Sequence, residues 1–179
     1  MNANLAMSTH RIWHLPADVD TDALAPGAYM QHGIEVIAQH CLENVLPRFA
    51  SEVQRGDVIV AGANFGIGSS REQAAGVLVQ LGVAAVIAPS YGGLFFRNAY
   101  NLGLPLLTCA AALADQTQLQ MDPHHYTLAL TDGTPLATDP VPDFLLDMVR
   151  AGGLLALLRQ RAKPGQTSAL ANPSSKDSV

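Results

Sequence analysis

Two short apolar runs with a helical pattern between them constrain the fold of this chain most strongly. Residues 57–61 (DVIVA) and 84–88 (AAVIA) are each typical of a short strand buried on both faces. Between them, apolar side chains recur at helical spacing over 69–81, and Gly82 ends the pattern. A strand, a helix and a second strand in this order predict parallel strands joined by a right-handed helical crossover.

The rest of the chain continues this alternation. The spacing of apolar residues predicts a helix over 34–49, a helix over 93–102, a strand over 104–109, and a helix over 142–161 broken at Gly152-Gly153. Residues 126–137 alternate around Asp132-Gly133, a dipeptide typical of hairpin turns. The predicted fold class is therefore α/β, with parallel βαβ units and an antiparallel hairpin.

Length and composition predict one folded domain with disordered ends. The 179 residues are 49% apolar and 14% charged, which is enough for one domain with a hydrophobic core. Both ends of the chain are rich in small and polar residues, and we expect residues 1–8 and 164–179 to be disordered. Residues 9–163 are then predicted to form a single domain.

Charge and hydropathy exclude two kinds of partner. The net charge of −5 argues against a nucleic-acid surface, which needs clustered Lys and Arg. No apolar run reaches the length of a membrane helix, and residues 1–16 lack the basic start and apolar block of a signal peptide. We therefore expect a cytoplasmic protein with no membrane partner.

The cysteines and histidines predict no metal site in this chain. The two cysteines, Cys41 and Cys109, are expected to be buried thiols rather than a disulfide, and two are too few for an iron–sulfur cluster. The six histidines show no spacing typical of zinc ligands. We therefore expect the chain itself to bind no metal or cofactor.

The loop 64–72 (NFGIGSSRE) carries the residues best suited to bind a ligand, and it lies between a buried strand and a helix start. Backbone N–H groups at a helix start favour an anion. Gly66 and Gly68 allow a close approach of the backbone, and Arg71 offers a planar donor fork for a carboxylate. Arg71 replaces the third glycine of a dinucleotide loop, and no Gly-Lys-Ser/Thr follows, so nucleotide binding is not expected.

The same residues fit a structural alternative. Ser69 and Glu72 have the spacing of a capping box, in which the Ser69 side chain accepts from the backbone N–H of Glu72. Arg71 would then be an ordinary surface arginine. Because capping boxes are common helix starts, the residues alone favour this interpretation over an anion site, without settling the choice.

Four longer stretches follow one another in a fixed order. They are DVDTDALAPGAYM (18–30), VIVAGANFGIGSSREQA (58–74), AVIAPSYGGLFFRNAYNLGLPLL (85–107) and PDFLLDMVRAGGLLALLRQ (142–160). Together they resemble the isopropylmalate isomerase small-subunit family, within the aconitase superfamily, from about residue 18 to residue 161. The resemblance implies the swivelling-domain fold of that superfamily, a β/β/α sandwich.

The resemblance also implies an activity and a partner. Members of this family remove water from a hydroxy acid and add it back at the neighbouring carbon, here in leucine biosynthesis with isopropylmalate. A large subunit binds the iron–sulfur cluster (4Fe–4S), and the small subunit closes over a small dicarboxylate in a heterodimer or larger assembly. The alternatives are a hydro-lyase for another substituted malate (homoaconitase, or a methyl- or dimethylmalate dehydratase) and a non-catalytic binding module of the same fold.

Position by position, the resemblance assigns roles to residues of two segments. Ser69 matches the catalytic base, Arg71 the arginine that binds the substrate carboxylate, and Ser70 a neighbouring hydrogen-bond donor. Thr21 and Asp22 match a segment that helps to orient groups in the closed cleft. The structural alternative for Thr21 and Asp22 is an Asx-type turn.

The loop with Gln31 and His32 matches the family's specificity loop, where an arginine suits an extra carboxylate and an apolar residue suits an isopropyl group. Gln31 is therefore a candidate substrate-binding residue, and its neutral amide disfavours a tricarboxylate without identifying the substituent. Ile67 and Gln73 depart from the family, which usually has cysteine and histidine there. Arg97 is expected to tie its helix down rather than to touch substrate.

Overall fold

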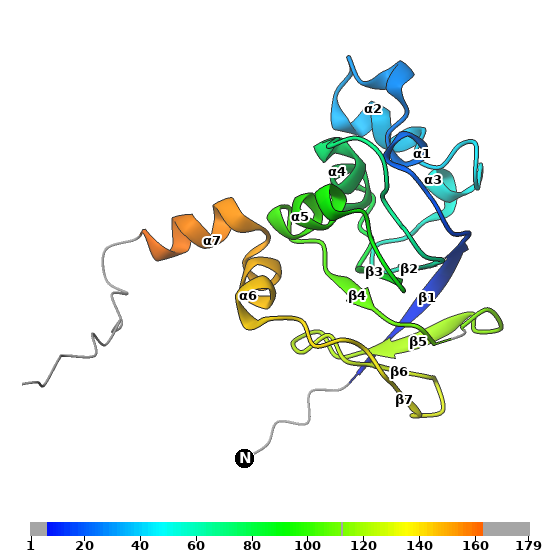
Figure 1. The fold of residues 1–179 in the computed structure, drawn as a ribbon, viewed down its shortest axis with the longest axis vertical. Helices are drawn as coiled ribbons and strands as arrows, with labels where there is room; N and C mark the ends of the chain where they lie inside the picture. Colours follow the sequence, from blue (N-terminus) through cyan, green and yellow to red (C-terminus); the bar gives the residue numbers. More distant parts are fainter. Residues whose placement is uncertain (1–6, 112, 163–179) are drawn as a thin grey trace, which may run out of the picture.

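A computed structural model describes residues 7–111 and 113–162. Within these residues, one sheet runs in the order β4-β3-β2-β1-β5-β6-β7 and curls back on itself (Figure 1). Its strands are β1 (Ser8–Leu15), β2 (Val58–Ala61), β3 (Ala85–Ala88), β4 (Leu106–Thr108), β5 (Gln118–Met121), β6 (Leu128–Ala129) and β7 (Pro135–Leu136). The helices are α1 (Thr21–Leu24), η1 (Gly27–Tyr29), α2 (Ile34–Gln39), α3 (Phe49–Glu52), α4 (Glu72–Gln80), α5 (Gly93–Asn101), α6 (Asp143–Ala151) and α7 (Leu154–Arg161).

Strand β1 belongs to both halves of the sheet. Its second half, from Ile12 to Leu15, pairs with β2 in parallel, and β3 and β4 continue the parallel half. Its first half, from Ser8 to Arg11, pairs with β5 in antiparallel register, and β6 and β7 extend that half as a hairpin. Helix α4 joins β2 to β3 and α5 joins β3 to β4. The predicted parallel βαβ units and the antiparallel hairpin are therefore confirmed.

Two hydrophobic cores lie on opposite faces of the parallel strands. Successive side chains of a strand point to opposite faces, so neighbouring strand residues enter different cores. Ile59 and Val86 belong to the larger core, which the helices cover. Val58 and Ile87 belong to the smaller core, which β5 and β6 complete. Helices, parallel strands and antiparallel strands thus form three layers, which is the expected β/β/α sandwich (Figure 1).

The helix expected over 34–49 is wrong, because α2 ends at Gln39 and turns follow until α3 begins at Phe49. Leu42 has a φ of +61° and is fully buried. Its N–H donates to the carbonyl of Ala23, in α1, at 2.8 Å. The apolar residues after Gln39 are therefore buried by a turn that packs against α1, and not by a continuous helix.

The apolar pattern does not predict β1, α1 or β5. Strand β1 begins at Ser8, so the folded part starts one residue before the expected boundary at residue 9. The expected disorder of residues 1–8 and 164–179 otherwise falls almost entirely outside the described residues. Strands β1 and β5 both carry polar residues, and they are stabilised by pairing with each other.

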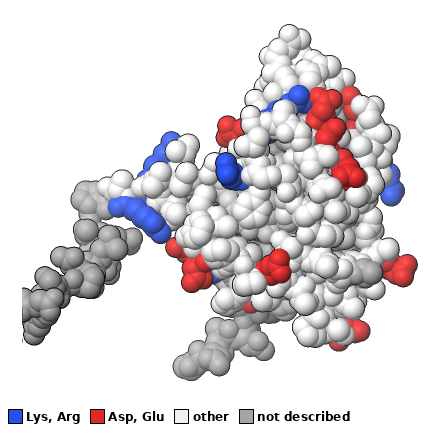
Figure 2. Space-filling model, in the orientation of Figure 1, with Lys and Arg blue, Asp and Glu red and all other residues white. Residues whose placement is uncertain are grey.

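The predicted break in the last helix is confirmed. Gly152 and Gly153 have φ values of +82° and +113°, and a Cβ on Gly153 would lie 2.5 Å from the carbonyl oxygen of Asn101. After this break, α7 extends away from the rest of the domain, and its last turn carries Arg159 and Arg161 (Figures 1 and 2). Among the described residues, no helix is long and apolar enough to cross a membrane.

Candidate active site

The loops after β1, β2 and β3 meet at one edge of the sheet. In the loop after β2, the Gly66 N–H donates to the carbonyl of Val19 at 2.7 Å, and the Ile67 carbonyl accepts from the Thr21 N–H at 2.8 Å. These bonds join the β2 loop to the β1 loop. In open α/β sheets, ligands bind outside the carboxyl ends of the parallel strands, so this edge is the expected place for a site.

Two glycines allow the loops to pack this closely. Gly66 has a φ of +74°, and a Cβ there would collide with the ring of Phe95. Gly92, in the loop after β3, donates its N–H to the Phe65 carbonyl at 2.8 Å, and a Cβ on Gly92 would collide with the Gly66 carbonyl. A side chain at either position would separate the loops.

A pair that sequence reasoning missed also braces this edge. The Asn64 side-chain amide donates to Asp18 Oδ1 at 2.8 Å, and both residues have φ values near +60° (59° for Asp18, 61° for Asn64). Asn and Asp are the residues that adopt this left-handed region most readily after glycine. That preference is the one signal in the sequence that could have marked the two positions as turns.

Ser69 and Thr21, which the resemblance places in the site, are in contact. The Ser69 N–H donates to Thr21 Oγ1 at 3.1 Å, and the two hydroxyl oxygens lie 3.3 Å apart. Thr21 is 2% exposed, whereas Ser69 is exposed at the surface. Because Thr21 Oγ1 already accepts from the Ser69 backbone, its own hydrogen is available to the Ser69 hydroxyl oxygen.

The capping box expected between Ser69 and Glu72 is wrong. Helix α4 begins at Glu72, its N-cap is Arg71, and the cap makes no side-chain hydrogen bond. Ser69 instead lies in the turn before the helix, where its carbonyl accepts from the Arg71 N–H at 2.7 Å. Ser69 contacts Thr21, and its hydroxyl does not cap α4.

Arg71 lies beside α1 and is largely covered. Its Nη1 donates to Asp22 Oδ1 at 2.6 Å and to the Ala25 carbonyl at 2.7 Å. Asp22 Oδ1 also accepts from the Gly27 N–H at 3.1 Å. The hydrogen bond from Arg71, then that from Gly27, hold the pKa of Asp22 below its ordinary value. Asp20, not Asp22, caps α1, through the Ala23 N–H at 2.7 Å.

The remaining candidates are exposed. Ser70 lies on the surface between Ser69 and Arg71. Gln31 is exposed in the turn between η1 and α2. Next to this turn, the Tyr29 ring stacks on the His40 ring, with the ring centroids 3.5 Å apart and an angle of 9° between the ring planes. The structure thus brings Thr21, Asp22, Ser69 and Arg71 together and leaves Gln31 on a neighbouring turn.

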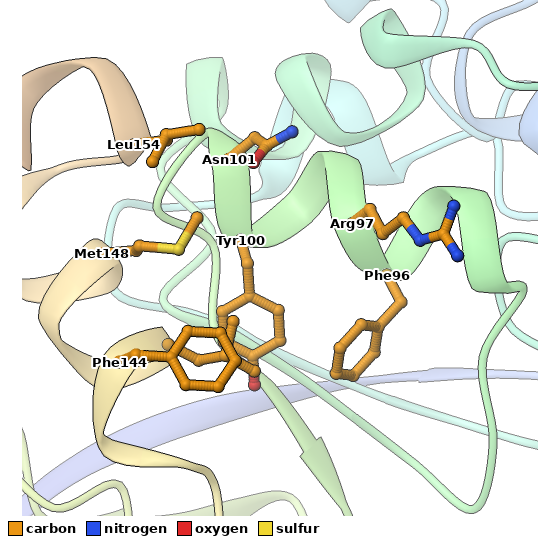
Figure 3. Close-up of a pocket in the computed structure, with 8 residues that line it drawn as sticks. Phe96, Arg97, Tyr100, Asn101, Phe144, Met148 and Leu154 are labelled. Carbon is orange, nitrogen blue, oxygen red and sulfur yellow. The ribbon is translucent and has the colours of Figure 1, made fainter. Parts of the chain in front are cut away.

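Arg97 belongs to a different region. It lines a groove of about 410 Å³ between α5, α6 and α7, together with apolar side chains such as Tyr100, Phe144 and Met148. The Arg97 guanidinium extends away from the aromatic side chains of this groove (Figure 3). Among the described residues, no hydrogen bond or ion pair joins Arg97 to Thr21, Asp22, Ser69 or Arg71.

The chain's own residues do not fit an iron–sulfur cluster. Cys41 and Cys109 are free, buried thiols, as expected, but they belong to different cores on opposite faces of the parallel strands. Burial raises the pKa of the Cys41 thiol, which opposes the thiolate that a metal needs. Over residues 7–111 and 113–162, no three His, Cys, Asp or Glu side chains are placed to hold a metal ion.

The β/β/α sandwich, together with the comparisons below, identifies an aconitase-type domain. The aconitase C-terminal domain matches residues 22–111, and the chain belongs to this family. Within the family it is similar to small subunits. It is 42% identical to 3-isopropylmalate dehydratase small subunit 1 of Archaeoglobus fulgidus over 159 residues, covering 85% of this chain and 99% of the relative.

Two further comparisons agree. The methanogen homoaconitase small subunit of Methanothermobacter thermautotrophicus is 40% identical over 147 residues, covering 81% of this chain and 86% of that protein. The crystal structure of 3-isopropylmalate dehydratase from Methanocaldococcus jannaschii matches with a TM-score of 0.78 and 33% identity, covering 87% of this chain and 95% of the other. The resemblance noted in the sequence is confirmed at the level of family and fold.

Proposed function

We propose that this chain is the small subunit of an aconitase-type hydro-lyase, and that with a large subunit it interconverts 2- and 3-isopropylmalate by dehydration and rehydration. One observation carries the proposal. Ser69 and Arg71 are two positions apart in the sequence, at the turn before α4. The Thr21 hydroxyl oxygen lies 3.3 Å from Ser69 Oγ. Relatives named as small subunits of 3-isopropylmalate dehydratase support it.

In this proposal Ser69 is the catalytic base. A serine alkoxide is costly, so it needs donors and positive charge close by. The Thr21 hydroxyl can donate to it, and Arg71, two residues further along the chain from Ser69, brings positive charge to the same turn. Ser70, exposed beside Ser69, supplies a further donor to the substrate.

Arg71 binds a substrate carboxylate, because its fork can donate two parallel hydrogen bonds to the two oxygens. Gln31 contacts the substituent that distinguishes one malate from another. A neutral amide does not pair with a third carboxylate, so Gln31 favours an uncharged substituent. The related homoaconitase small subunit makes homoaconitate chemistry the second candidate, with methyl- or dimethylmalate as further ones.

The partner in this proposal is a large subunit that carries a 4Fe–4S cluster, the Lewis acid for the leaving hydroxyl. The two cysteines of this chain are divided between its two cores, so the partner must supply the cluster ligands. We also propose a cytoplasmic location, where free thiols such as Cys41 and Cys109 stay reduced.

Co-expression with the large subunit, anaerobic cluster reconstitution and a hydration assay test the proposal. The panel contains unsaturated diacids with isopropyl, methyl, dimethyl and carboxyalkyl substituents. We expect turnover that requires both subunits and is fastest with the isopropyl compound. A stable complex with an intact cluster and no turnover on any compound would contradict the proposal and leave a binding module.

A further inference from the structure

One nitrogen of Arg71 is fully engaged by the protein itself. Nη1 carries two hydrogens, and it donates to Asp22 Oδ1 at 2.6 Å and to the Ala25 carbonyl at 2.7 Å. Within residues 7–111 and 113–162, neither Nε nor Nη2 of Arg71 makes a hydrogen bond. The Arg71 side chain is 21% exposed, so the guanidinium is held at the edge of the domain rather than free in solvent.

This arrangement leaves one edge of the Arg71 guanidinium, formed by Nε and Nη2, available to a ligand. A carboxylate pairs with a guanidinium through two parallel N–H groups, from Nη1 and Nη2 or from Nε and Nη2. Because Nη1 is taken, only the edge formed by Nε and Nη2 can receive a second carboxylate in two-point contact. The position of the Asp22 carboxylate thus determines which edge of Arg71 is presented to a ligand.

We infer that Asp22 is a positioning residue, which with the Ala25 carbonyl holds Arg71 so that its Nε and Nη2 edge receives the substrate carboxylate. The inference rests on the proposed function, in which Arg71 binds that carboxylate. A direct bond from Asp22 to the substrate would place two like charges together, which disfavours binding. Asp22 is ionised at neutral pH like an ordinary aspartate, and hydrogen bonds from Arg71 and Gly27 lower its pKa further.

Asp22 suits a test by mutation because it lies outside the hydrophobic core and does not cap α1. It is exposed, its side chain being 66% accessible, and α1 keeps its cap from Asp20 when Asp22 is replaced. Asp147, on α6, is a matched control. It forms exposed pairs with Arg150 at 3.4 Å and Arg161 at 3.3 Å and belongs to a different part of the chain.

The first experiment is a double-mutant cycle in the reconstituted complex. Asp22→Ala should raise KM about tenfold and lower kcat less than about threefold, because the ground-state contact is misplaced. In an Arg71→Ala background, Asp22→Ala should have no further effect on KM. Asp22→Asn, which keeps an acceptor oxygen, should recover part of the loss, and Asp147→Ala should leave KM unchanged.

The second experiment needs no substrate. In the isolated chain, nitrogen NMR of the guanidinium should resolve Nη1 and Nη2 of Arg71 separately, because their hydrogen bonds slow rotation. Asp22→Ala should merge the two signals, whereas Asp147→Ala should not. If the wild-type complex lacks hydro-lyase activity, the proposed function fails, but this measurement still decides whether Asp22 orders Arg71.

Two results would overturn the inference. Equal KM effects of Asp22→Ala with and without Arg71 would mean that Asp22 acts on substrate directly. Unchanged Arg71 signals in Asp22→Ala would mean that Ala25 alone holds the guanidinium. Melting curves of each variant separate these outcomes from a loss of folding.

Discussion

Ser69 is a residue whose local sequence favours one role and whose long-range contact allows another. The spacing from Ser69 to Glu72 is that of a cap, and only the contact with Thr21, 48 residues away, removes Ser69 from the helix start. No local pattern could have predicted that contact. The residues themselves marked the loop and Arg71 as suited to an anion, whereas the role of Ser69 as a base came from the resemblance. The contacts of Arg71 with Asp22 and the Ala25 carbonyl come from the fold.

Replacing Ser69 tests the catalytic role directly. Ser69→Ala in the assembled enzyme should lower kcat by about two to four orders of magnitude, the usual effect of removing a positioned base. The melting temperature should change little, because Ser69 does not cap α4. Ser51→Ala, which removes an exposed serine hydroxyl on α3, is the matched control. Near-normal turnover of Ser69→Ala would exclude it as the base.

Arg71→Lys tests whether substrate binding needs the paired N–H groups of the guanidinium or only a positive charge. Lysine keeps the positive charge but cannot present two parallel N–H groups, so KM should rise about tenfold or more, with a smaller loss of kcat. Steady-state kinetics of the complex measure both. Arg48→Lys, in an exposed pair with Glu52, should behave as wild type. A normal KM in the Arg71→Lys enzyme would argue against two-point binding of the carboxylate.

At the scale of elements, the spacing of apolar residues predicted the helices that bury one face and the strands that are buried on both faces. Strands β2 and β3 and helices α5, α6 and α7 fall close to the predicted ranges because their apolar residues face a core. The parts that were predicted wrongly depend on single positions. Leu42 ends the stripe of α2 through a left-handed φ, which an apolar residue does not indicate in sequence. Strand β1 mixes polar and apolar residues, because its two halves pair with different strands.

A buried carboxylate links β1 to the start of β2 and predicts a loss of stability in acid. Burial alone would raise the pKa of Asp57, but hydrogen bonds from Arg11, the Gln54 N–H and the Trp13 indole outweigh it and lower the pKa. A carboxylate with a lowered folded pKa stabilises the protein fully above its unfolded pKa of about 3.9, and this stabilisation is lost as pH falls through the folded pKa.

Urea unfolding between about pH 7 and pH 3 measures this effect. The free energy of unfolding should be nearly flat above about pH 5 and fall below about pH 4, where the unfolded chain takes up the proton first. Asp57→Asn should cost about 2 kcal/mol at neutral pH and flatten the acid limb. Asp139→Asn, at an exposed position after β7, is the control. An acid limb that is equally steep in Asp57→Asn would assign the loss of stability to other groups.

At the scale of the whole molecule, the proposed function requires a second subunit to complete the site. Its candidate residues Gln31, Ser69 and Ser70 are exposed, and its two thiols are buried in separate cores. We therefore expect the isolated chain to retain no stoichiometric iron or sulfide after anaerobic reconstitution and gel filtration. The same treatment with the large subunit present is the positive control. Iron and sulfide that stay with the isolated chain, and are lost in Cys41→Ser, would contradict this expectation.

Strand β1 pairs with both β2 and β5, and this has a consequence for folding during synthesis on the ribosome. Strand β1 is synthesised before β5, and the partner of Ser8 in β5, Met121, lies 113 residues further along the chain. Until Met121 has left the exit tunnel, the first half of β1 has an open edge of unpaired N–H and C=O groups. The helix-covered parallel half can form earlier, since β2 to β4 are already made. A nascent chain arrested before β5 should therefore be a partly folded, chaperone-dependent species, and release beyond β5 should close the sheet.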